Sequence, residues 1–516
     1  MSGTFPSDKR IQMLCSALSN AEGKSTPINA PFTGKKLYDL PTGTAKDVAA
    51  AASKVRLAQV AWQASTPAAR KAVLLKAHDL IVKRREDLLD LLQSETGKTR
   101  GQAFEEIFQS ASVARYYALS ANRVLRSRGR RSAIPTVLRA RVNYQPKGLI
   151  GVVTPWNYPL SLAAMDVIPA LAAGNGVLQK ADNQGALSIL ALREAFVDAG
   201  LPADLWAVVT GDGAEIGDAI NDVSDYICFT GSTATGTKVG LRAAAALRGA
   251  SLELGGKNPM IVLDDVDPVK AARAAVYACF SSMGQLCVSI ERIYVLRGVA
   301  EAFTTEFANR TGELNQSAAF DYSSDVGSLT LPSQLKRVEE HVKDAVDKGA
   351  KLLAGGQSRP ELGPLFFAPT VLTDVTSEMR CSGNETFGPV VAISVVDSET
   401  EAVIAANDSE FGLNSSIFSG SVRRARRIAA LLHTGSVNIN EGYRASFSTV
   451  AAPMGGMKSS GLGRRNGSEG LLRFVESQTV ANATGFIKLP NTGAEFSKLS
   501  GLLLILLKTL RLLHRK

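Results

Sequence analysis

The stretch that decides the fold is LIGVVTPWNYPLSLAAMDVIPALAAGNGVLQKA, residues 149–181. It contains two short apolar runs, Leu149–Thr154 and Gly176–Gln179, separated by a helical length of chain. Such runs are typical of buried parallel strands joined by crossover helices. Three further runs continue the pattern: Trp206–Thr210, Tyr226–Phe229 and Met260–Leu263. Together they predict a wound parallel α/β sheet, the architecture of nucleotide-binding folds.

The chain before this sheet is predicted to be helical from about Ala45 to Arg126, because its apolar residues recur at helical spacing. Thr44 and Ser65 precede such runs and are expected to cap helices. Residues Thr136–Tyr144 have strand character and follow Pro135, which favours an arm or edge hairpin.

A second series of strand and helix patterns follows residue 287 and predicts a second α/β domain. Its candidate strands are Ile293–Leu296, Lys351–Leu353, Val390–Val395 and Ser436–Asn438. The glycine cluster Gly455–Gly467 marks a loop, and a further strand is expected over Gln478–Ala481. Two α/β domains in tandem are the simplest arrangement.

The composition is that of a large globular enzyme, with 516 residues, 45% of them apolar and 21% charged. Half of the net charge of +10 comes from residues 497–516, which hold five cations and no acid. The stretch Arg123–Lys147 holds eight more cations and no acid. Because the aromatic interleaving of nucleic-acid modules is absent, a solvated surface or subunit contact is favoured there over nucleic acid binding.

The five cysteines are odd in number and scattered, which argues against a disulfide framework or a zinc site. They are Cys15, Cys228, Cys279, Cys287 and Cys381. Residues 1–10 are polar and no apolar segment follows, so no signal peptide is recognised. We therefore expect a cytoplasmic protein with reduced thiols and no metal site.

The tail LSGLLLILLKTLRLLHRK, residues 499–516, is apolar and basic. Its apolar run is too short to span a bilayer, which needs about 20 residues. Later leucines interleave with Lys508, Arg511 and Arg515, as in an interfacial helix attracted to anionic lipid. Two interpretations stay open: peripheral contact with the inner face of the membrane, or a terminal helix packed on the protein or on a partner subunit.

Three motifs carry candidate chemistry. FTGSTATG, residues 229–236, offers helix-start amides and a small hydroxyl to a pyrophosphate, although it is not a G-x-G-x-x-G fingerprint. In LELGGKNP, residues 252–259, Glu253 lies in an apolar segment, where it is either a general base of raised pKa or a cap or ion-pair partner. In GQLC, residues 284–287, Cys287 is either a nucleophile or a small buried apolar residue.

In combination these segments resemble the aldehyde dehydrogenase superfamily, from about residue 30 to 485. The matching segments, in the family's order, are Thr154–Pro159, Gly174–Asn175, Gln179–Lys180, Phe229–Gly236, Glu253–Pro259, Gly284–Cys287, Glu385–Pro389, and Pro453–Gly456 with Lys458–Gly461.

The resemblance implies an aldehyde-dehydrogenase-like α/β fold. A Rossmann-type cofactor domain would cover residues 1–127 and 150–255, and an α/β catalytic domain residues 256–445. A small oligomerisation arm would cover 128–149 and 470–490, followed by the tail, 495–516. Members form dimers or tetramers through this arm, so the resemblance also implies a homodimer or homotetramer.

The resemblance implies a covalent mechanism for NAD(P)-dependent oxidation of an aldehyde to a carboxylate. Cys287 would attack the aldehyde carbon, and the oxyanion would be held by the Asn157 side-chain amide and the Cys287 backbone N–H. Glu253 would then activate water to hydrolyse the thioester. An electropositive or hydrogen-bonding environment is expected to help ionise the thiol.

Cofactor contacts are implied in the same way. Lys180 would contact the adenosine ribose, Ser232 the pyrophosphate and Glu385 the nicotinamide ribose. The remaining predicted contacts line the same cleft: Trp156, Asn183, Gly231, Gly236, Leu254, Gly255 and Phe387.

The cofactor preference is predicted from Asn183, because many NAD-specific members carry a glutamate at this position. Loss of that anion relieves repulsion of a 2′-phosphate, so NADP is favoured over NAD. Asp182 restores the preference for NAD if its carboxylate turns inward.

The substrate is predicted by similarity to bacterial succinate-semialdehyde dehydrogenases, over Ser289–Val295, Val437–Tyr443 and Gly463–Arg465. Members of that activity carry two arginines where this chain has Met165 and Ser281, although Arg444 is expected to offer a substitute charge. The main alternative is a medium- or long-chain aliphatic or an aromatic aldehyde, acted on at the membrane.

The sequence also bears on three alternative functions. A cysteine hydrolase needs a histidine base, and His78, His341, His433 and His514 all lie outside the motifs. A non-enzymatic structural role is disfavoured because Cys287, Glu253 and Asn157 are all present. Acyl transfer to coenzyme A is disfavoured by Glu253 but stays open.

Overall fold

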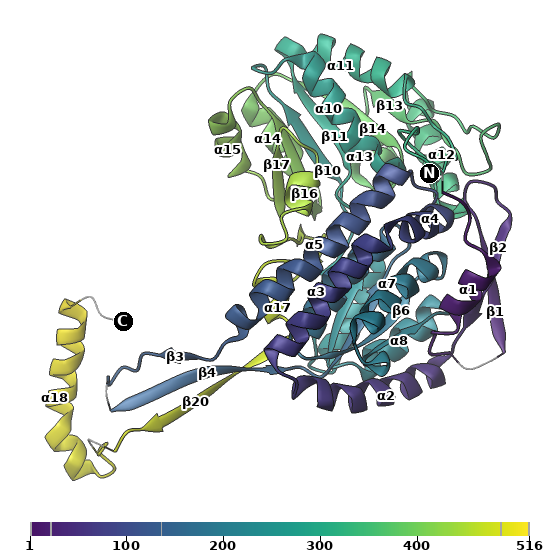
Figure 1. The fold of residues 1–516 in the computed structure, drawn as a ribbon. Coiled ribbons are helices and arrows are strands. Elements are labelled where there is room, and N and C mark those ends of the chain that lie inside the picture. The colour runs from purple at the N-terminus through teal and green to yellow at the C-terminus, as the bar shows by residue number, and fades with distance from the viewer. Residues whose placement is uncertain (1–2, 21–22, 136, 486–487, 514–516) are drawn as a thin grey trace.

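The computed structural model describes residues 3–20, 23–135, 137–485 and 488–513. It contains two α/β bodies and an arm that extends from one of them (Figure 1). Thr136 of the predicted arm strand and residues 514–516 of the tail lie outside the described residues.

The first sheet has six strands in the order β19-β9-β8-β5-β6-β7. Strands β5 to β9 run parallel, and β19 pairs antiparallel with β9. The strands are β5 (Leu149–Thr154), β6 (Gly176–Ala181), β7 (Trp206–Val209), β8 (Tyr226–Thr230), β9 (Gly249–Glu253) and β19 (Gly461–Leu462). Four of the five predicted strands are confirmed as members of this sheet.

The prediction that Met260–Leu263 belongs to the first sheet is wrong. This segment lies in β10 (Asn258–Val262), which pairs with β11 and β16 of the second sheet. The chain crosses between the bodies at Gly255 and Gly256. A Cβ on Gly256 would lie 2.5 Å from the carbonyl oxygen of Cys287, so the crossing needs a residue without a side chain.

Helices cover both faces of the first sheet. Helices α2 (Ala45–Gln63), α8 (Gly213–Val223) and α9 (Thr233–Ala245) pack on one face around Leu178. The other face is covered by α3 (Pro67–Lys83), α4 (Arg85–Thr96), α5 (Arg100–Leu125), α6 (Pro159–Ala172) and α7 (Ala186–Ala199). Burial on both faces explains why the strands are continuously apolar.

The predicted caps are half right. Helix α2 begins after Thr44, whose backbone N–H donates to Asp47 over 2.7 Å. Helix α3 begins after Thr66, whose hydroxyl accepts from the Ala69 N–H. Ser65 instead donates its hydroxyl to the carbonyl oxygen of Trp62 and so ends the preceding helix.

The second sheet has seven strands in the order β12-β13-β14-β11-β10-β16-β17, parallel except for β12. Beside β10 these are β11 (Ile290–Leu296), β12 (Lys351–Ala354), β13 (Thr370–Thr373), β14 (Val390–Val396), β16 (Asn414–Phe418) and β17 (Ser436–Ile439). Its helices are α10 (Pro268–Phe280), α11 (Arg297–Gly312), α12 (Pro332–Asp347), α13 (Arg380–Gly383), α14 (Glu399–Asn407) and α15 (Val422–Ala429). The four predicted strands are confirmed, whereas β13 and β16 were not predicted.

The arm is a three-stranded antiparallel sheet, in which β4 (Leu138–Pro146) lies between β3 (Arg128–Arg130) and β20 (Val475–Ala483). Figure 1 shows the arm extending from the first body, with α18 (Gly493–Leu512) beside its outer end. Within the described residues, no helix is both long and apolar enough to cross a membrane.

The remaining elements are short. They are α1 (Asp8–Cys15), β1 (Lys24–Asn29), β2 (Lys36–Thr42), β15 (Phe411–Gly412), β18 (Met457–Lys458), α16 (Arg444–Phe447) and α17 (Glu469–Leu472), with single 3₁₀ turns at Asn183–Gly185, Ala203–Leu205 and Ser281–Gly284.

Candidate active site

A cavity of about 270 Å³ lies where β5, β8 and β9 end and the second body begins. It brings together ten of the thirteen predicted site residues. These are Trp156, Asn157, Gly231, Ser232, Glu253, Leu254, Gly255, Cys287, Glu385 and Phe387. Residues of α12 that the sequence motifs did not indicate, Gln334 and Arg337 among them, complete the wall.

Cys287 lies at the end of a strained turn. Ser282 and Met283 have φ of 49° and 58°, in the left-handed region that favours glycine. A Cβ on Gly284 would lie 2.2 Å from the carbonyl oxygen of Gly388, which explains the glycine before the cysteine. The Asn258 side-chain amide donates to the Cys287 carbonyl over 2.7 Å and fixes its backbone.

The environment of the Cys287 thiol differs from the expected electropositive one. Burial raises its pKa to about 12, with further contributions from the Glu253 and Glu385 carboxylates, while Arg465 acts in the opposite direction. This environment favours the neutral thiol over the thiolate.

Asn157 is held by a buried ion pair that sequence motifs did not indicate. Lys98 donates to Glu106 and also to the Asn157 carbonyl oxygen, over 2.8 Å. Glu106 accepts from the backbone N–H groups of Leu160 and Ser161, the first amides of α6. A carboxylate at a helix N-terminus is stabilised by those amides, so the pair fixes the loop that carries Asn157.

Glu253 is buried, and its Oε1 has no hydrogen-bond partner among the described residues. Burial raises its pKa to about 7, although Arg465 favours the ionised form. An unpartnered carboxylate oxygen that titrates near neutrality suits a general base.

Glu385 and Phe387 are positioned by a second buried ion pair, Lys257 with Glu291. Glu291 accepts from the N–H groups of Thr386 and Phe387, over 3.0 and 2.9 Å. Glu385 itself accepts from the Gly256 N–H over 2.8 Å. The signal was present in the sequence, because Lys257 lies inside the motif that contains Glu253.

The first turn of α9 forms the expected helix-start site. The Ser232 hydroxyl accepts from the Thr235 N–H, and Gly231 lines the cavity beside it. Gly236 does not line the cavity; a Cβ there would lie 2.2 Å from Leu254 Cδ2, so it allows the helix to pack on that residue. The helix-start donors and the open cavity fit a pyrophosphate.

Lys180 and Asn183 also lie outside this cavity. Lys180 Nζ is 3.9 Å from Asp182 Oδ2. The Asn183 side-chain oxygen accepts from the Gly211 N–H over 3.0 Å, and Asp182 accepts from the Gln184 N–H. The Asp182 carboxylate is thus directed into its own turn and towards Lys180.

The expected substrate side contains polar groups in place of an arginine clamp. Met165 and Ser281 are buried, and Arg444 is ion-paired with Glu441 while its guanidinium lies 4.3 Å from the centre of the Tyr277 ring. The hydroxyls of Tyr277 and Tyr443 both donate to the half-buried carboxyl of Glu105.

Burial raises the pKa of Glu105, although the hydrogen bonds from the two tyrosines lower it. Further along α5, Gln109 is buried with no partner for either polar atom of its side-chain amide among the described residues. The hydroxyls of Tyr277, Tyr443 and Ser281 are thus connected to a carboxyl of raised pKa, a cluster that no motif indicated.

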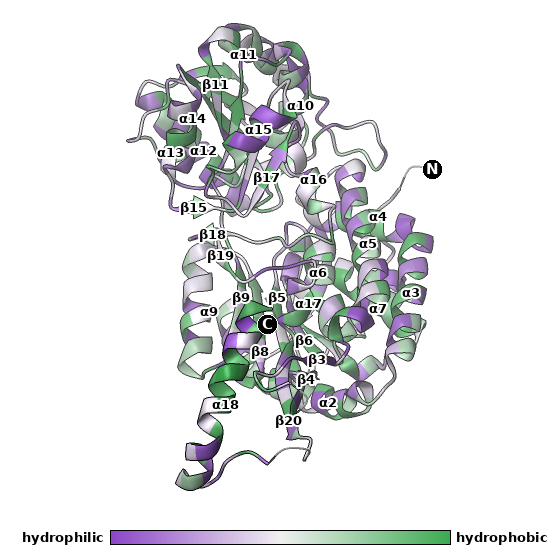
Figure 2. Ribbon diagram, turned by 90° about the vertical axis from the view of Figure 1, so that its left-hand side faces the viewer, coloured by the Kyte–Doolittle hydropathy of each residue, from purple (hydrophilic) through white to green (hydrophobic). Residues whose placement is uncertain are grey.

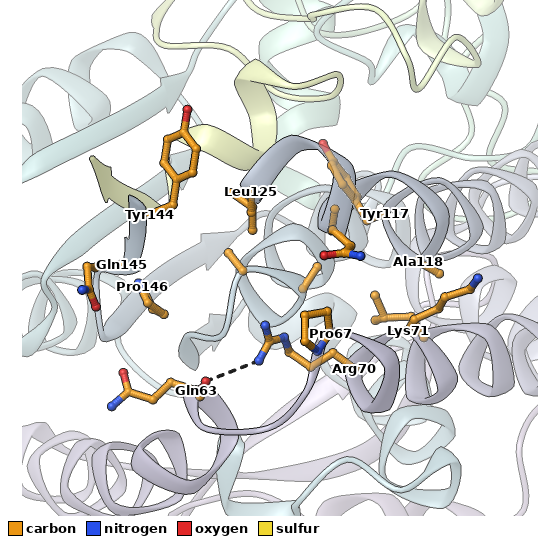
Figure 3. Close-up of a pocket in the computed structure, with 15 residues that line it drawn as sticks. Gln63, Pro67, Arg70, Lys71, Tyr117, Ala118, Leu125, Tyr144, Gln145 and Pro146 are labelled. Atoms are coloured by element: carbon orange, nitrogen blue, oxygen red, sulfur yellow. Dashed lines mark hydrogen bonds between the residues drawn. The ribbon is translucent and has the colours of Figure 1, made fainter. Parts of the chain in front are cut away.

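A second cavity, of about 310 Å³, lies at the base of the arm between α3, α5 and β4 (Figure 3). Figure 3 shows the Arg70 guanidinium reaching across it towards Gln63. Arg70 also donates to the carbonyl oxygens of Trp62 and Ser65, which end α2. None of the predicted site residues lines this cavity, and we assign Arg70 a structural role there.

The Lys98–Glu106 pair yields a stability prediction. Replacing Lys98 with Met leaves the Glu106 carboxylate buried without its cation, which costs about 3–5 kcal/mol. The melting temperature of Lys98→Met should fall clearly below that of the parent in a calorimetric scan. Lys76→Met, an exposed position on α3, serves as the control and should melt like the parent. Equal melting temperatures for the two variants would contradict the assigned role of the pair.

Comparisons with known proteins agree with this geometry. The aldehyde dehydrogenase family model matches residues 18–480. A Mycolicibacterium smegmatis protein named "Putative succinate-semialdehyde dehydrogenase (NADP(+))" is 50% identical over 460 residues, 89% of each chain. A Mycobacterium tuberculosis protein of the same name, numbered 2, is 48% identical over 477 residues, 92% of each chain.

Solved structures are equally similar. An NADP-dependent enzyme of E. coli superposes with a TM-score of 0.85 at 33% identity, covering 89% of this chain and 95% of that one. Betaine aldehyde dehydrogenase of Staphylococcus aureus in complex with NAD+ superposes with a TM-score of 0.87 at 30% identity, covering 92% and 94%. The chain therefore belongs to the aldehyde dehydrogenase family and is an NAD(P)-dependent oxidoreductase that acts on an aldehyde group.

Proposed function

We propose that Cys287, Asn157 and Glu253 carry the oxidation, and that succinate semialdehyde is the substrate. The single observation that carries the assignment of roles is that one cavity contains a thiol, an amide and an unpartnered carboxylate that titrates near neutrality. Each supplies one chemical requirement of the cycle: a nucleophile, an oxyanion donor and a base.

The first half of the cycle forms the bond to sulfur. The Cys287 Sγ attacks the aldehyde carbon while the thiol proton passes to Glu253, the nearby carboxylate whose charge raises the thiol's pKa. The carbonyl oxygen becomes an oxyanion, held by the Asn157 Nδ2–H and the Cys287 N–H. One such donor contributes about 3–4 kcal/mol to the transition state.

The second half breaks that bond. A bound nicotinamide dinucleotide would supply the acceptor for the hydride that leaves the former aldehyde carbon, and Cys287 would then carry the thioester. Glu253 first passes the thiol proton to solvent and then removes a proton from water, and the resulting hydroxide attacks the thioester carbon. The sulfur leaves as a thiolate and takes that proton back from Glu253, while the carboxylic acid formed loses its proton to solvent. The products are a carboxylate and the regenerated thiol.

The residues fit a dinucleotide, and we propose NADP as the preferred form, with NAD also accepted. Ser232, Gly231 and the first amides of α9 would hold the pyrophosphate. Glu385 and Phe387 would hold the nicotinamide half, with the Phe387 ring 5.8 Å from that of Trp156. Lys180 would contact the adenosine ribose, with Asn183 leaving room for a 2′-phosphate.

Succinate semialdehyde is supported by the names of the mycobacterial relatives and by the polar groups around Ser281. Its distal carboxylate would be bound with Arg444 near the mouth. The hydroxyls of Tyr277 and Tyr443 would serve as neutral donors by turning from the Glu105 carboxyl, to which both donate. This differs from an arginine clamp, because neutral donors bind a carboxylate less strongly than a guanidinium does.

Glu253→Gln tests the mechanism. The variant should still form up to one equivalent of NADPH per active site, because hydride leaves before water is needed, but more slowly than the parent, because Glu253 also takes the thiol proton. Steady-state turnover should fall by about 100-fold or more, because the base is lost. In the parent, turnover should rise as the pH increases through about 7, where Glu253 loses its proton.

Cys287→Ala is the companion variant and should give neither this single equivalent nor turnover while still binding NADPH. Cys279→Ala, which removes another buried thiol, should behave like the parent. Stopped-flow absorbance measures all three variants. An unchanged steady-state rate in Glu253→Gln would exclude Glu253 as the base.

A substrate and cofactor panel tests the specificity. Succinate semialdehyde with NADP should give the highest kcat/KM, ahead of hexanal, decanal and benzaldehyde and ahead of the same reactions with NAD. A higher kcat/KM for decanal would favour the long-chain alternative, and a strong preference for NAD would refute the cofactor assignment. Product analysis with coenzyme A present distinguishes hydrolysis from acyl transfer.

We also propose that the arm joins subunits into a homo-oligomer and that α18 contacts anionic membrane at the inner face. Several side chains of α18 are over half exposed, among them Leu502, Leu504 and Ile505, and Figure 2 shows the helix green along this part. Between α18 and the arm lies a cavity of about 810 Å³ lined by Arg130, Arg131, Arg139 and Arg141. Exposed apolar side chains beside arginines suit an anionic lipid surface.

Removal of residues 497–516 tests this contact. The parent should sediment with phosphatidylserine-containing vesicles and stay in solution with pure phosphatidylcholine vesicles, and the truncated chain should stay in solution with both. Lys508→Glu is the charge control and should weaken binding without altering activity. If the parent does not sediment with either kind of vesicle, the membrane contact is excluded and α18 is assigned to a contact between subunits. Light scattering then measures the mass of the oligomer with and without residues 497–516.

A further inference from the structure

A buried ion cluster lies beneath the catalytic cavity. Arg465 donates to Asp166 through Nε and Nη2, over 2.9 and 2.5 Å, and Arg473 donates to the same carboxylate over 2.6 Å. Asp166 is 1% exposed and Arg465 is 2% exposed. Two cations share one anion, so the cluster places an excess positive charge in the interior, where an unbalanced charge is costly.

The position of Arg465 relates this excess charge to Glu253. Arg465 Nη2 also donates to the Thr230 hydroxyl. Thr230 is the direct partner of Glu253 across strands β8 and β9. Arg465 therefore lies under the pair of strand ends from which the Glu253 carboxylate enters the cavity.

The segment before Arg465 encloses the carboxylate from the other side. Arg465 and Met454 form an isolated bridge, and Gly461 pairs with Glu253 itself. A Cβ on Gly455 would lie 3.0 Å from Glu253 Oε1, so the loop lies directly against the carboxylate. Since Oε1 has no hydrogen-bond partner among the described residues, packing and the local field are what position it.

The cluster also reaches the other catalytic groups. Asp166 lies on α6, the helix that begins just after Asn157, so the Asp166–Arg465 contact joins that helix to the loop under Glu253. Arg465 also opposes the rise in the pKa of Cys287. The charge of one buried guanidinium thus acts on Glu253 and Cys287, and its contact with Asp166 holds the helix that follows Asn157.

We propose that Arg465 is a positioning residue for Glu253: the buried Asp166–Arg465–Arg473 cluster fixes the carboxylate and supplies the positive charge that keeps it ionised during thioester hydrolysis. The proposal rests on the proposed function of Glu253 as the base. It assigns opposite effects to the members of the cluster, because Arg465 favours the carboxylate anion and Asp166 opposes it.

The charges around Glu253 support these signs. After burial, which raises the pKa of Glu253, the charge of Arg465 lowers it, that of Asp166 raises it, and those of Arg473 and Arg464 lower it. Within the cavity, Cys287 and Glu385 are the other titrating groups, and the Glu253→Gln profile distinguishes their contribution from that of Glu253. Loss of Arg465 should therefore raise the pH at which half of Glu253 is ionised, and loss of the Asp166 charge should lower it.

The test is the pH dependence of steady-state turnover in the full-length enzyme with aldehyde and NADP, from pH 5.5 to 9. Arg465→Met should raise the midpoint by about one unit and lower turnover at pH 7 about fivefold, as the ionised fraction falls. Arg465→Lys, which keeps the charge, should retain the parent midpoint. Asp166→Asn should lower the midpoint. If Arg465→Met does not fold, the shift in Asp166→Asn tests the proposal by itself.

Arg193→Met is the matched structural control, because Arg193 is a partly buried arginine on α7 that donates to the Trp206 carbonyl, away from the cavity. It should lower the melting temperature without moving the midpoint. Midpoints that stay at the parent value in Arg465→Met and Asp166→Asn, or that move in the same direction, overturn the proposal. If Glu253→Gln gives the same pH profile as the parent, the pH dependence does not come from Glu253. That result overturns the proposed function instead.

Discussion

The structure depends on one kind of contact, a buried carboxylate that accepts backbone N–H groups from an element it does not belong to. Glu106, on α5, holds the first amides of α6. Glu95, on α4, does the same for α7 through the N–H groups of Leu187 and Ser188. Glu291, on β11, holds the loop that carries Phe387. Because each carboxylate satisfies donors that would otherwise be buried and unpaired, the helices and loops around the cavity have one allowed position.

The cavity combines several acidic groups whose proton affinity is raised by burial, and the Glu253 and Glu385 carboxylates raise that of Cys287 further. The pKa values of Glu253 and Glu385 both rise to about 7 through burial, and that of Cys287 to about 12. In the proposed mechanism the proton starts on the sulfur, and the neighbouring Glu253 carboxylate receives it. The cost of this arrangement is offset by cations placed beneath the acids, Lys257 under one and Arg465 under the other.

Most of the fold and the centre of the site were predictable from the sequence, because the signals are local. Apolar runs mark the strands, and Asn157, Glu253 and Cys287 follow strand ends or a glycine turn within recognisable motifs. The sheet to which β10 belongs was not predictable, because the crossing at Gly255 and Gly256 changes the partner without changing the apolar pattern. The pairs Lys98–Glu106 and Arg465–Asp166 were also missed, since their members lie 8 and 299 residues apart and pair only through tertiary packing.

The crossing at Gly255–Gly256 has a mechanical consequence. Glu253 ends a strand of one body, while Asn258 begins a strand of the other and holds the carbonyl of Cys287. Only four residues separate Glu253 from Asn258, and two of them are glycines. The proposed base and the proposed nucleophile are therefore anchored to different bodies, so their alignment depends on how the two bodies pack against each other.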